Sequence, residues 1–173
     1  EVASLALSGG DVLPPPPPKL KFFASWVQGA QHRKMSLAYD TATKECEVRL
    51  DGQAAAFVVS LKDGKGTPLE AIDLRIGRAV DVLGRRTTLQ QAAGTTVGWL
   101  ANAAWALDEA QQVLEASLLL SGVCPPPMLH SRDAVISRTG TTSLRELSRR
   151  TKLMQSMWRD APPPQPLKDG TRR

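Results

Sequence analysis

The sequence predicts an α+β fold, in which a small, mainly β domain of antiparallel strands is closed by a helix. A proline-rich arm precedes this domain and a basic helical tail follows it. Apolar residues alternate with a period of two over residues 19–61, as in half-buried strands. From about residue 97 the apolar period lengthens to three and four, as in an amphipathic helix. Most of the 13 prolines stand in three runs that separate these regions, Pro14–Pro18, Pro125–Pro127 and Pro162–Pro164.

A chain of 173 residues has room for one domain of ordinary size with additional arms. We therefore divide it into an arm (1–18), a domain (19–122) and a tail (123–173). The arm is predicted to be extended, because two glycines and five consecutive prolines disfavour a helix. Such an arm is either a stiff spacer or a ligand for an aromatic groove.

The domain is predicted to begin with a meander of antiparallel strands. Four runs of alternating apolar residues each end at a turn that contains glycine or aspartate, which is the pattern of consecutive hairpins. These runs begin near Leu20, Met35, Cys46 and Ala56. Two shorter strands are expected next, one from Leu74 to Val82 through Gly77 and one at Thr87–Leu89 after a tight turn at Gly84.

The strands are followed by one long predicted helix. Apolar residues at three- and four-residue steps form one face, with Trp99 and Trp105 beside it. Thr95 or Thr96 is the expected N-cap, and Gly122 followed by Pro125 is the expected stop. An amphipathic helix in this position is expected to lay its apolar face on an open sheet or a barrel mouth.

The tail carries the positive charge of the chain. The net charge is +5, and residues 125–173 contain ten Lys and Arg against four acids. A capping box at Ser143–Glu146 predicts a helix over about 143–159 whose apolar face includes Met154. This helix either docks on its own domain or binds a groove of an acidic partner. The residues predicted to bind a partner are Arg145, Arg149, Arg150, Lys152, Trp158 and Arg159.

Motifs for catalysis, metals and cofactors are missing from the sequence. The two histidines, His32 and His130, stand far apart, and the two cysteines, Cys46 and Cys124, lack the spacing of a metal site. We therefore expect no enzyme, no cofactor and no metal, in a reducing compartment. No membrane span and no signal peptide are expected either. Nucleic-acid binding is considered unlikely, because the aromatics do not interleave with basic residues as in stacking platforms.

Part of the domain resembles a known module. The pattern Leu74-x-Ile76-Gly77-x-x-Val80-x-Val82-Leu83-Gly84-Arg85-x-x-x-Leu89, followed by Thr95, Thr96 and Trp99, resembles the closing half of the DM-ten domain of ciliary proteins. Leu20–Ala24, Met35–Asp40 and Glu45–Val48 are similar to the first three strands of that family, so the resemblance covers residues 19–105. Ala92-Ala93-Gly94 replaces the Cys-Asp pair that is common in the family.

The resemblance implies both a fold and a function. The fold would be a pleckstrin-like antiparallel β-barrel that is closed by a C-terminal helix. The protein would be a structural part of the ciliary or flagellar axoneme, on the inner wall of the doublet microtubule, with tubulin and neighbouring axonemal proteins as partners. Its location would be the cytoplasm and cytoskeleton. Two alternatives remain open: an adaptor whose barrel binds a peptide or a phosphoinositide, and a protein that binds nucleic acid through the basic tail.

Overall fold

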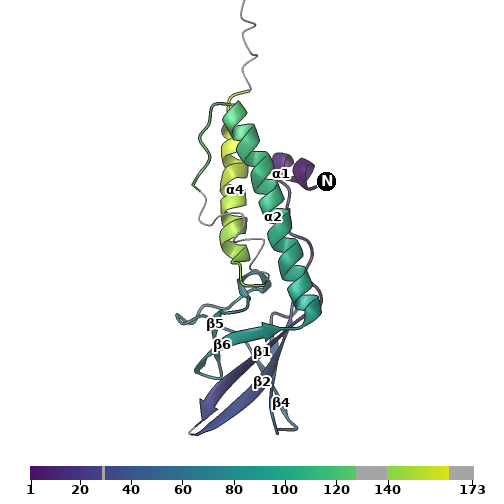
Figure 1. Ribbon diagram of the computed structural model, residues 1–173, viewed down its shortest axis with the longest axis vertical. Helices are drawn as coiled ribbons and strands as arrows, with labels where there is room; N and C mark the ends of the chain where they lie inside the picture. Colours follow the sequence, from purple (N-terminus) through teal and green to yellow (C-terminus); the bar gives the residue numbers. More distant parts are fainter. Residues whose placement is uncertain (29, 128–139, 164–173) are drawn as a thin grey trace, which may run out of the picture.

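An antiparallel sheet forms one end of the molecule, and a stalk of helices forms the other (Figure 1). The computed structural model describes residues 1–28, 30–127 and 140–163. In these residues it has six strands and three α-helices, so the predicted α+β class is confirmed. The helices are α1 (Val2–Ser8), α2 (Gly94–Leu120) and α4 (Leu144–Asp160), and a short 3-10 helix, η1, spans Ala71–Asp73. The strands are β1 (Lys19–Gln28), β2 (Gln31–Asp40), β3 (Cys46–Leu50), β4 (Ala56–Val59), β5 (Ala79–Val82) and β6 (Arg85–Ala92).

The sheet is a half-barrel with strand order β4-β3-β2-β1-β6-β5. Alternation along each strand directs one set of side chains inward, such as Leu20 and Phe22 on β1 and Leu37 on β2, and these are almost fully buried. The four predicted runs form β1 to β4 as expected. Beyond the end of β4, Lys62 forms an isolated antiparallel bridge with Asp81 of β5.

Strand β5 is shorter than the sequence predicts, whereas β6 is longer. Leu74 and Ile76 lie outside any strand, because the chain forms η1 just before them and Gly77 adopts a φ of +84°. The tight turn at Gly84 is confirmed: Leu83 (φ +54°) and Gly84 (φ +75°) join the two strands. Two consecutive positive φ values are typical of the type I′ turn that best fits the twist of a hairpin.

The first half of helix α2 packs on the sheet as expected, whereas its second half extends beyond the sheet into the stalk. Its first half contributes Trp99, Leu100 and Leu107 to the core of the sheet. Its second half, with Leu114 and Leu118, packs against α1 and α4 in a separate apolar core. The helix thus belongs to two cores at once.

The N-cap of α2 is also corrected. The capping position is Ala93, which makes no side-chain cap. The Thr96 hydroxyl instead accepts a hydrogen bond from the backbone N–H of Lys21, 2.8 Å away, and joins the helix to β1. At the other end Gly122 (φ +74°) stops the helix as predicted.

The predicted extended arm contains a helix. Residues Val2–Ser8 form α1, and Gly9 at φ +76° ends it in the left-handed conformation that glycine adopts without strain. Ala6 is fully buried in the stalk core, so packing outweighs the low helical preference of the neighbouring glycines and prolines. The prolyl run then follows the body of the protein: Trp99 Nε1 donates to the carbonyl of Pro14 (3.1 Å), and the Thr41 hydroxyl donates to that of Pro17 (3.1 Å).

Candidate partner-binding surfaces

Ser143 is the N-cap of α4, so one half of the predicted capping box is confirmed. The Ser143 hydroxyl accepts a hydrogen bond from the backbone N–H of Glu146, as predicted. Leu144, Leu147 and Met154 are buried against the rest of the molecule. The helix is therefore docked on its own chain, and only its outer face is accessible to a partner.

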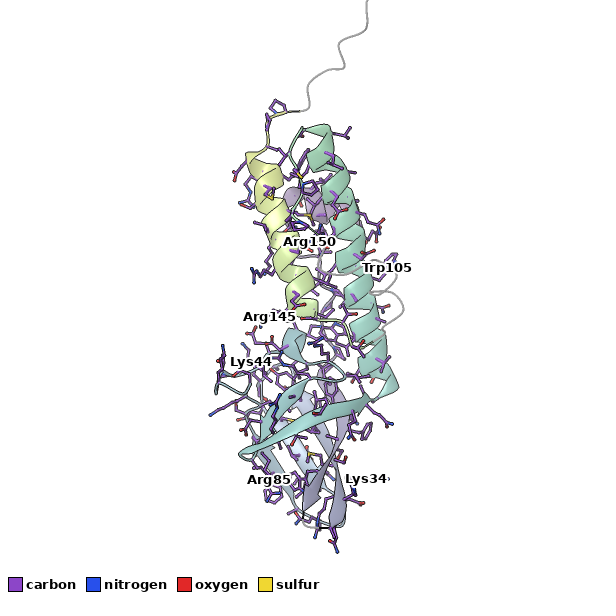
Figure 2. All side chains as sticks on the ribbon, turned by 60° about the vertical axis from the view of Figure 1, so that its left-hand side comes forward. Lys34, Lys44, Arg85, Trp105, Arg145 and Arg150 are labelled. Atoms are coloured by element: carbon purple, nitrogen blue, oxygen red, sulfur yellow. The ribbon has the colours of Figure 1, made fainter. Side chains whose placement is uncertain are left out.

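Arg145 anchors the first turn of α4 to η1. Its guanidinium donates to Asp73 and Glu70, with Nη2 at 2.8 Å from Asp73 Oδ2 and 2.9 Å from Glu70 Oε2. Lys44 Nζ lies 3.2 Å from the other oxygen of Glu70. Hydrogen bonds from Lys44 and Arg145 hold the pKa of the Glu70 carboxyl below its ordinary value. Arg145, near the junction of sheet and stalk in Figure 2, is thus occupied by contacts within the chain.

Arg150 is buried and has an intramolecular role, which corrects its place in the predicted docking set. Its side chain is 7 % exposed and lies between α4 and α2 (Figure 2). The guanidinium donates to Gln111 Oε1 (2.6 Å), to Glu115 Oε1 (2.6 Å) and to the carbonyls of Pro126 (2.7 Å) and Pro127 (3.3 Å). Such a set of charge-assisted bonds offsets the cost of burying the cation and fixes the helix pair in one register.

Trp158 also belongs in part to the stalk. The ring is half-buried and packs on the apolar core that contains Ala6, Leu118 and Met154. An indole in this position contributes to folding through its buried area whether or not it meets a partner.

The three remaining predicted residues form an exposed basic stripe. Arg149, Lys152 and Arg159 are exposed and take part in none of the ion pairs between described residues. Their spacing places them along one face of α4, beside Leu153, whose side chain is 50 % exposed. Lys152 and Arg159 also line a hollow of about 350 Å³ against the segment 9–12. We call Arg149, Lys152, Leu153 and Arg159 the stalk face.

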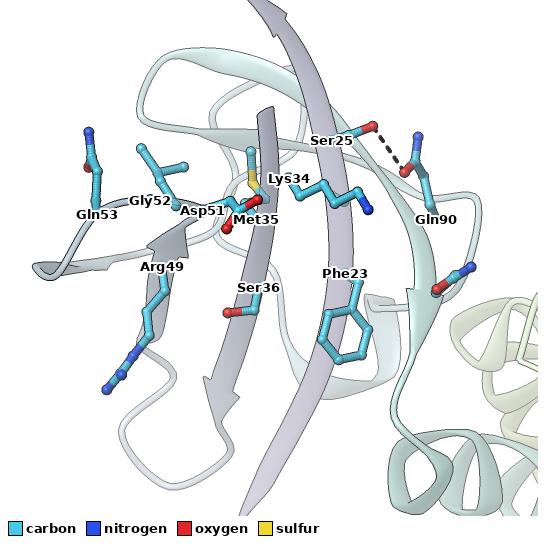
Figure 3. Close-up of a pocket in the computed structure, with 13 residues that line it drawn as sticks. Phe23, Ser25, Lys34, Met35, Ser36, Arg49, Asp51, Gly52, Gln53 and Gln90 are labelled. Atoms are coloured by element: carbon cyan, nitrogen blue, oxygen red, sulfur yellow. Dashed lines mark hydrogen bonds between the residues drawn. The ribbon is translucent and has the colours of Figure 1, made fainter. Parts of the chain in front are cut away.

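A second candidate surface, which the sequence reasoning missed, lies on the outer side of the sheet (Figure 3). Strand alternation on β1 sends Lys19, Lys21, Phe23 and Ser25 outward, and all but Ser25 are exposed. The ring of Phe23 is 43 % exposed, which is unusual for a large aromatic that has strands on both sides.

The neighbouring strands complete a shallow groove of about 660 Å³ around Phe23. The register pairs Phe23 with Ser36 of β2, and Ser36 with Arg49 of β3. The other polar residues that line the groove are Ser25, Lys34, Asp51, Gln53, Gln90 and Gln91. An adjoining hollow of about 470 Å³ extends it past Lys19, Lys21 and Glu47. We call the two hollows together the sheet groove.

Positive charge predominates in the sheet groove. Lys19, Lys21, Lys34 and Arg49 line it, whereas the only carboxylates among its lining residues are Glu47 and Asp51. Arg49 pairs with Glu47 at 2.7 Å, and this hydrogen bond, with the nearby Arg49, Lys19 and Lys21 charges, lowers the pKa of the Glu47 carboxyl. The three lysines take part in none of the ion pairs between described residues.

One sequence signal could have identified this surface. Lys19, Lys21 and Phe23 stand at every second position, so a strand necessarily places them on one face. Phe22 and Ala24, which alternate with them in the sequence, point into the core.

The possible metal ligands are scattered over the part of the chain that the structure describes. His32 is exposed on β2, whereas His130 lies outside the described residues, as do the tail cations Arg132, Arg138, Lys168, Arg172 and Arg173. Among the described residues, no group of three or more metal-ligating side chains is close enough together to hold an ion. None of the helices described in 1–28, 30–127 and 140–163 combines the length and apolarity needed to cross a membrane.

Comparison with family models and with curated proteins finds no match to this chain.

Proposed function

We propose that this protein is a non-catalytic structural protein that binds an acidic partner through the stalk face, and that the partner is tubulin of the axonemal doublet. The observation that carries the proposal is the unpaired state of Arg149, Lys152 and Arg159 within the described chain, next to the exposed Leu153. An apolar side chain among unpaired cations combines long-range attraction to an acidic surface with a contact that buries apolar area.

The choice of tubulin rests on the resemblance of residues 74–89 to the DM-ten domain. In this proposal the half-barrel is a pleckstrin-like module, neighbouring axonemal proteins are additional partners, and the protein is located in the cilium or flagellum. The elongated outline in Figure 1 supports a structural role, because such a body reaches from one subunit of a lattice to another. The hydrogen bonds that join Arg145 and Arg150 of α4 to η1 and α2 favour a rigid part over a flexible adaptor.

Co-sedimentation with microtubules tests the proposal. The full chain is compared with a charge-reversed variant of the stalk face, Arg149→Glu, Lys152→Glu and Arg159→Glu. A matched control reverses three exposed cations at the other end of the molecule, Lys62→Glu, Lys65→Glu and Arg86→Glu. Each reversed charge at an interface is expected to weaken binding by about 1 kcal/mol or more, so the stalk variant should bind on the order of 100-fold more weakly.

The control variant is expected to pellet like the unmodified chain. Equal pelleting of both variants would show that charge at the stalk face does not direct binding. A wild-type chain that stays in the supernatant at micromolar tubulin would contradict the choice of tubulin.

A further inference from the structure

The sheet groove lies on the sheet, whereas the stalk face lies on α4, so the function of the groove is a separate question (Figure 1). Three features occur there together. A 43 % exposed Phe23 stands at the centre, lysines flank it along β1 and on β2, and amide and hydroxyl side chains surround it. No part of the described chain covers the groove.

We propose that the sheet groove binds single-stranded nucleic acid. A base stacks on the ring of Phe23, while Lys19, Lys21 and Lys34 contact phosphates on either side. Proteins that bind single strands combine an aromatic platform with a positively charged groove, because every base has a π-face and every nucleotide carries a negative charge. This proposal is independent of the stalk face and of the partner proposed for it.

The arrangement of the lysines fits a strand that crosses the sheet. Lys34 of β2 is the register partner of Ser25, whereas Lys21 precedes Phe23 on β1, so the two cations lie on opposite sides of the ring. From Lys19 to Ser25 the outer face of β1 extends for about 20 Å. This length accommodates a site on the order of four nucleotides, which is the lower end of the range of site sizes in domains that bind single strands.

The polar residues of the groove favour a nucleic acid over an acidic polypeptide. Gln53, Gln90 and Gln91 each carry a donor and an acceptor, as the edges of bases require. The Ser25 hydroxyl already donates to Gln90 Oε1 at 3.1 Å, which leaves the amide nitrogen of that glutamine available to donate (Figure 3). A site built for carboxylates would need donors alone and would gain nothing from an exposed aromatic ring.

Fluorescence anisotropy with labelled oligothymidine and oligouridine of twelve nucleotides, added to the full chain, tests the proposal. Phe23→Ala is expected to lower the affinity roughly 5- to 150-fold. Loss of one base stacked on an aromatic side chain weakens binding by about this factor. Phe23→Tyr retains the ring and should retain the affinity. Lys21→Gln should reduce the slope of log affinity against log salt by about 0.7.

Two control variants make the result specific. Trp105→Ala removes another aromatic, 60 % exposed but located on α2, and should leave the affinity unchanged. The triple reversal of the stalk face should also leave it unchanged. Thermal unfolding of Phe23→Ala checks that the sheet is intact, which its exposed position leads us to expect.

Three results would overturn the proposal. The oligonucleotides could fail to bind at 50 mM salt, or they could bind with an affinity that Phe23→Ala does not alter. Labelled polyglutamate could bind with an affinity that depends on Phe23 while the oligonucleotides do not bind, and this would assign the groove to an acidic polypeptide instead.

Discussion

Replacing Arg150 by alanine tests whether the buried guanidinium holds the stalk together. Arg150 makes four hydrogen bonds across the stalk, to Gln111, to Glu115 and to the carbonyls of Pro126 and Pro127. Removing one partner of a buried ion pair typically costs about 3–5 kcal/mol, because the acceptors that remain were desolvated for that partner. We expect a loss in this range, which is a large part of the roughly 5–15 kcal/mol that stabilises an ordinary domain.

Urea unfolding followed by circular dichroism measures the change in the free energy of unfolding. For a chain of this size, the expected loss corresponds to a fall in Tm of roughly 6–20 °C. Arg150→Lys keeps the charge but has no planar fork, so it should lie between alanine and wild type. Arg149→Ala, one position earlier and exposed, is the matched control and should stay within about 0.5 kcal/mol of wild type. A loss below about 1 kcal/mol for Arg150→Ala would refute the reasoning, because a well-satisfied buried cation cannot be that dispensable.

Three further predictions concern the sheet end and the thiols. Leu83→Asn should raise stability by about 1 kcal/mol in thermal unfolding, because leucine is strained at φ +54° and asparagine is not; an unchanged Tm would argue against strain. Burial raises the pKa of Cys46 to about 12, so Ellman's reagent at pH 8 should titrate only the exposed Cys124 until denaturant is added. Hydrogen bonds from Lys44 and then Arg145 lower the folded-state pKa of Glu70, so its stabilising contribution is present above the ordinary pKa and is lost as the pH falls through the folded value. Lys44→Gln should therefore raise the pKa of Glu70 in an NMR titration, and an unshifted pKa would show that the lysine has no such effect.

The strands were predictable because their information is local. A half-buried strand repeats every two residues, and each run in residues 19–61 ends at a turn with glycine or aspartate, so β1 to β4 follow from the pattern. The N-cap of α4 is equally local, and Ser143 was identified as the cap from a pattern of four residues. These features depend on neighbours in the sequence, and tertiary contacts only add to them.

The features that sequence reasoning missed depend on distant residues. Helix α1 is short and is followed by glycines and prolines, so it forms only because Ala6 is buried against α2 and α4. Arginine is exposed by default, and only the approach of Gln111 and Glu115 explains why Arg150 is not. The direction of α2 likewise depended on which surfaces would be available to cover its apolar face.

The candidate site was predicted in part. Exposed cations on α4 were expected, and Arg149, Lys152 and Arg159 are exposed. The sequence could not distinguish them from Arg145, which binds the η1 segment, or from Arg150, which binds α2. That distinction needs the rotation of the helix about its axis, which its packing against α2 determines. The sheet groove required the pairing register of three strands, which is a non-local property.

Because α2 is shared by both cores, it fixes the distance between the sheet and the far end of the stalk. Twenty-seven helical residues span about 40 Å, and each half of the helix is clamped by its own set of buried side chains. In the part of the chain that the structure describes, the same continuous helix therefore joins the two ends. Two ligands bound at opposite ends would therefore be kept at a fixed distance and angle. The second ligand would bind without a loss of conformational entropy from a flexible linker.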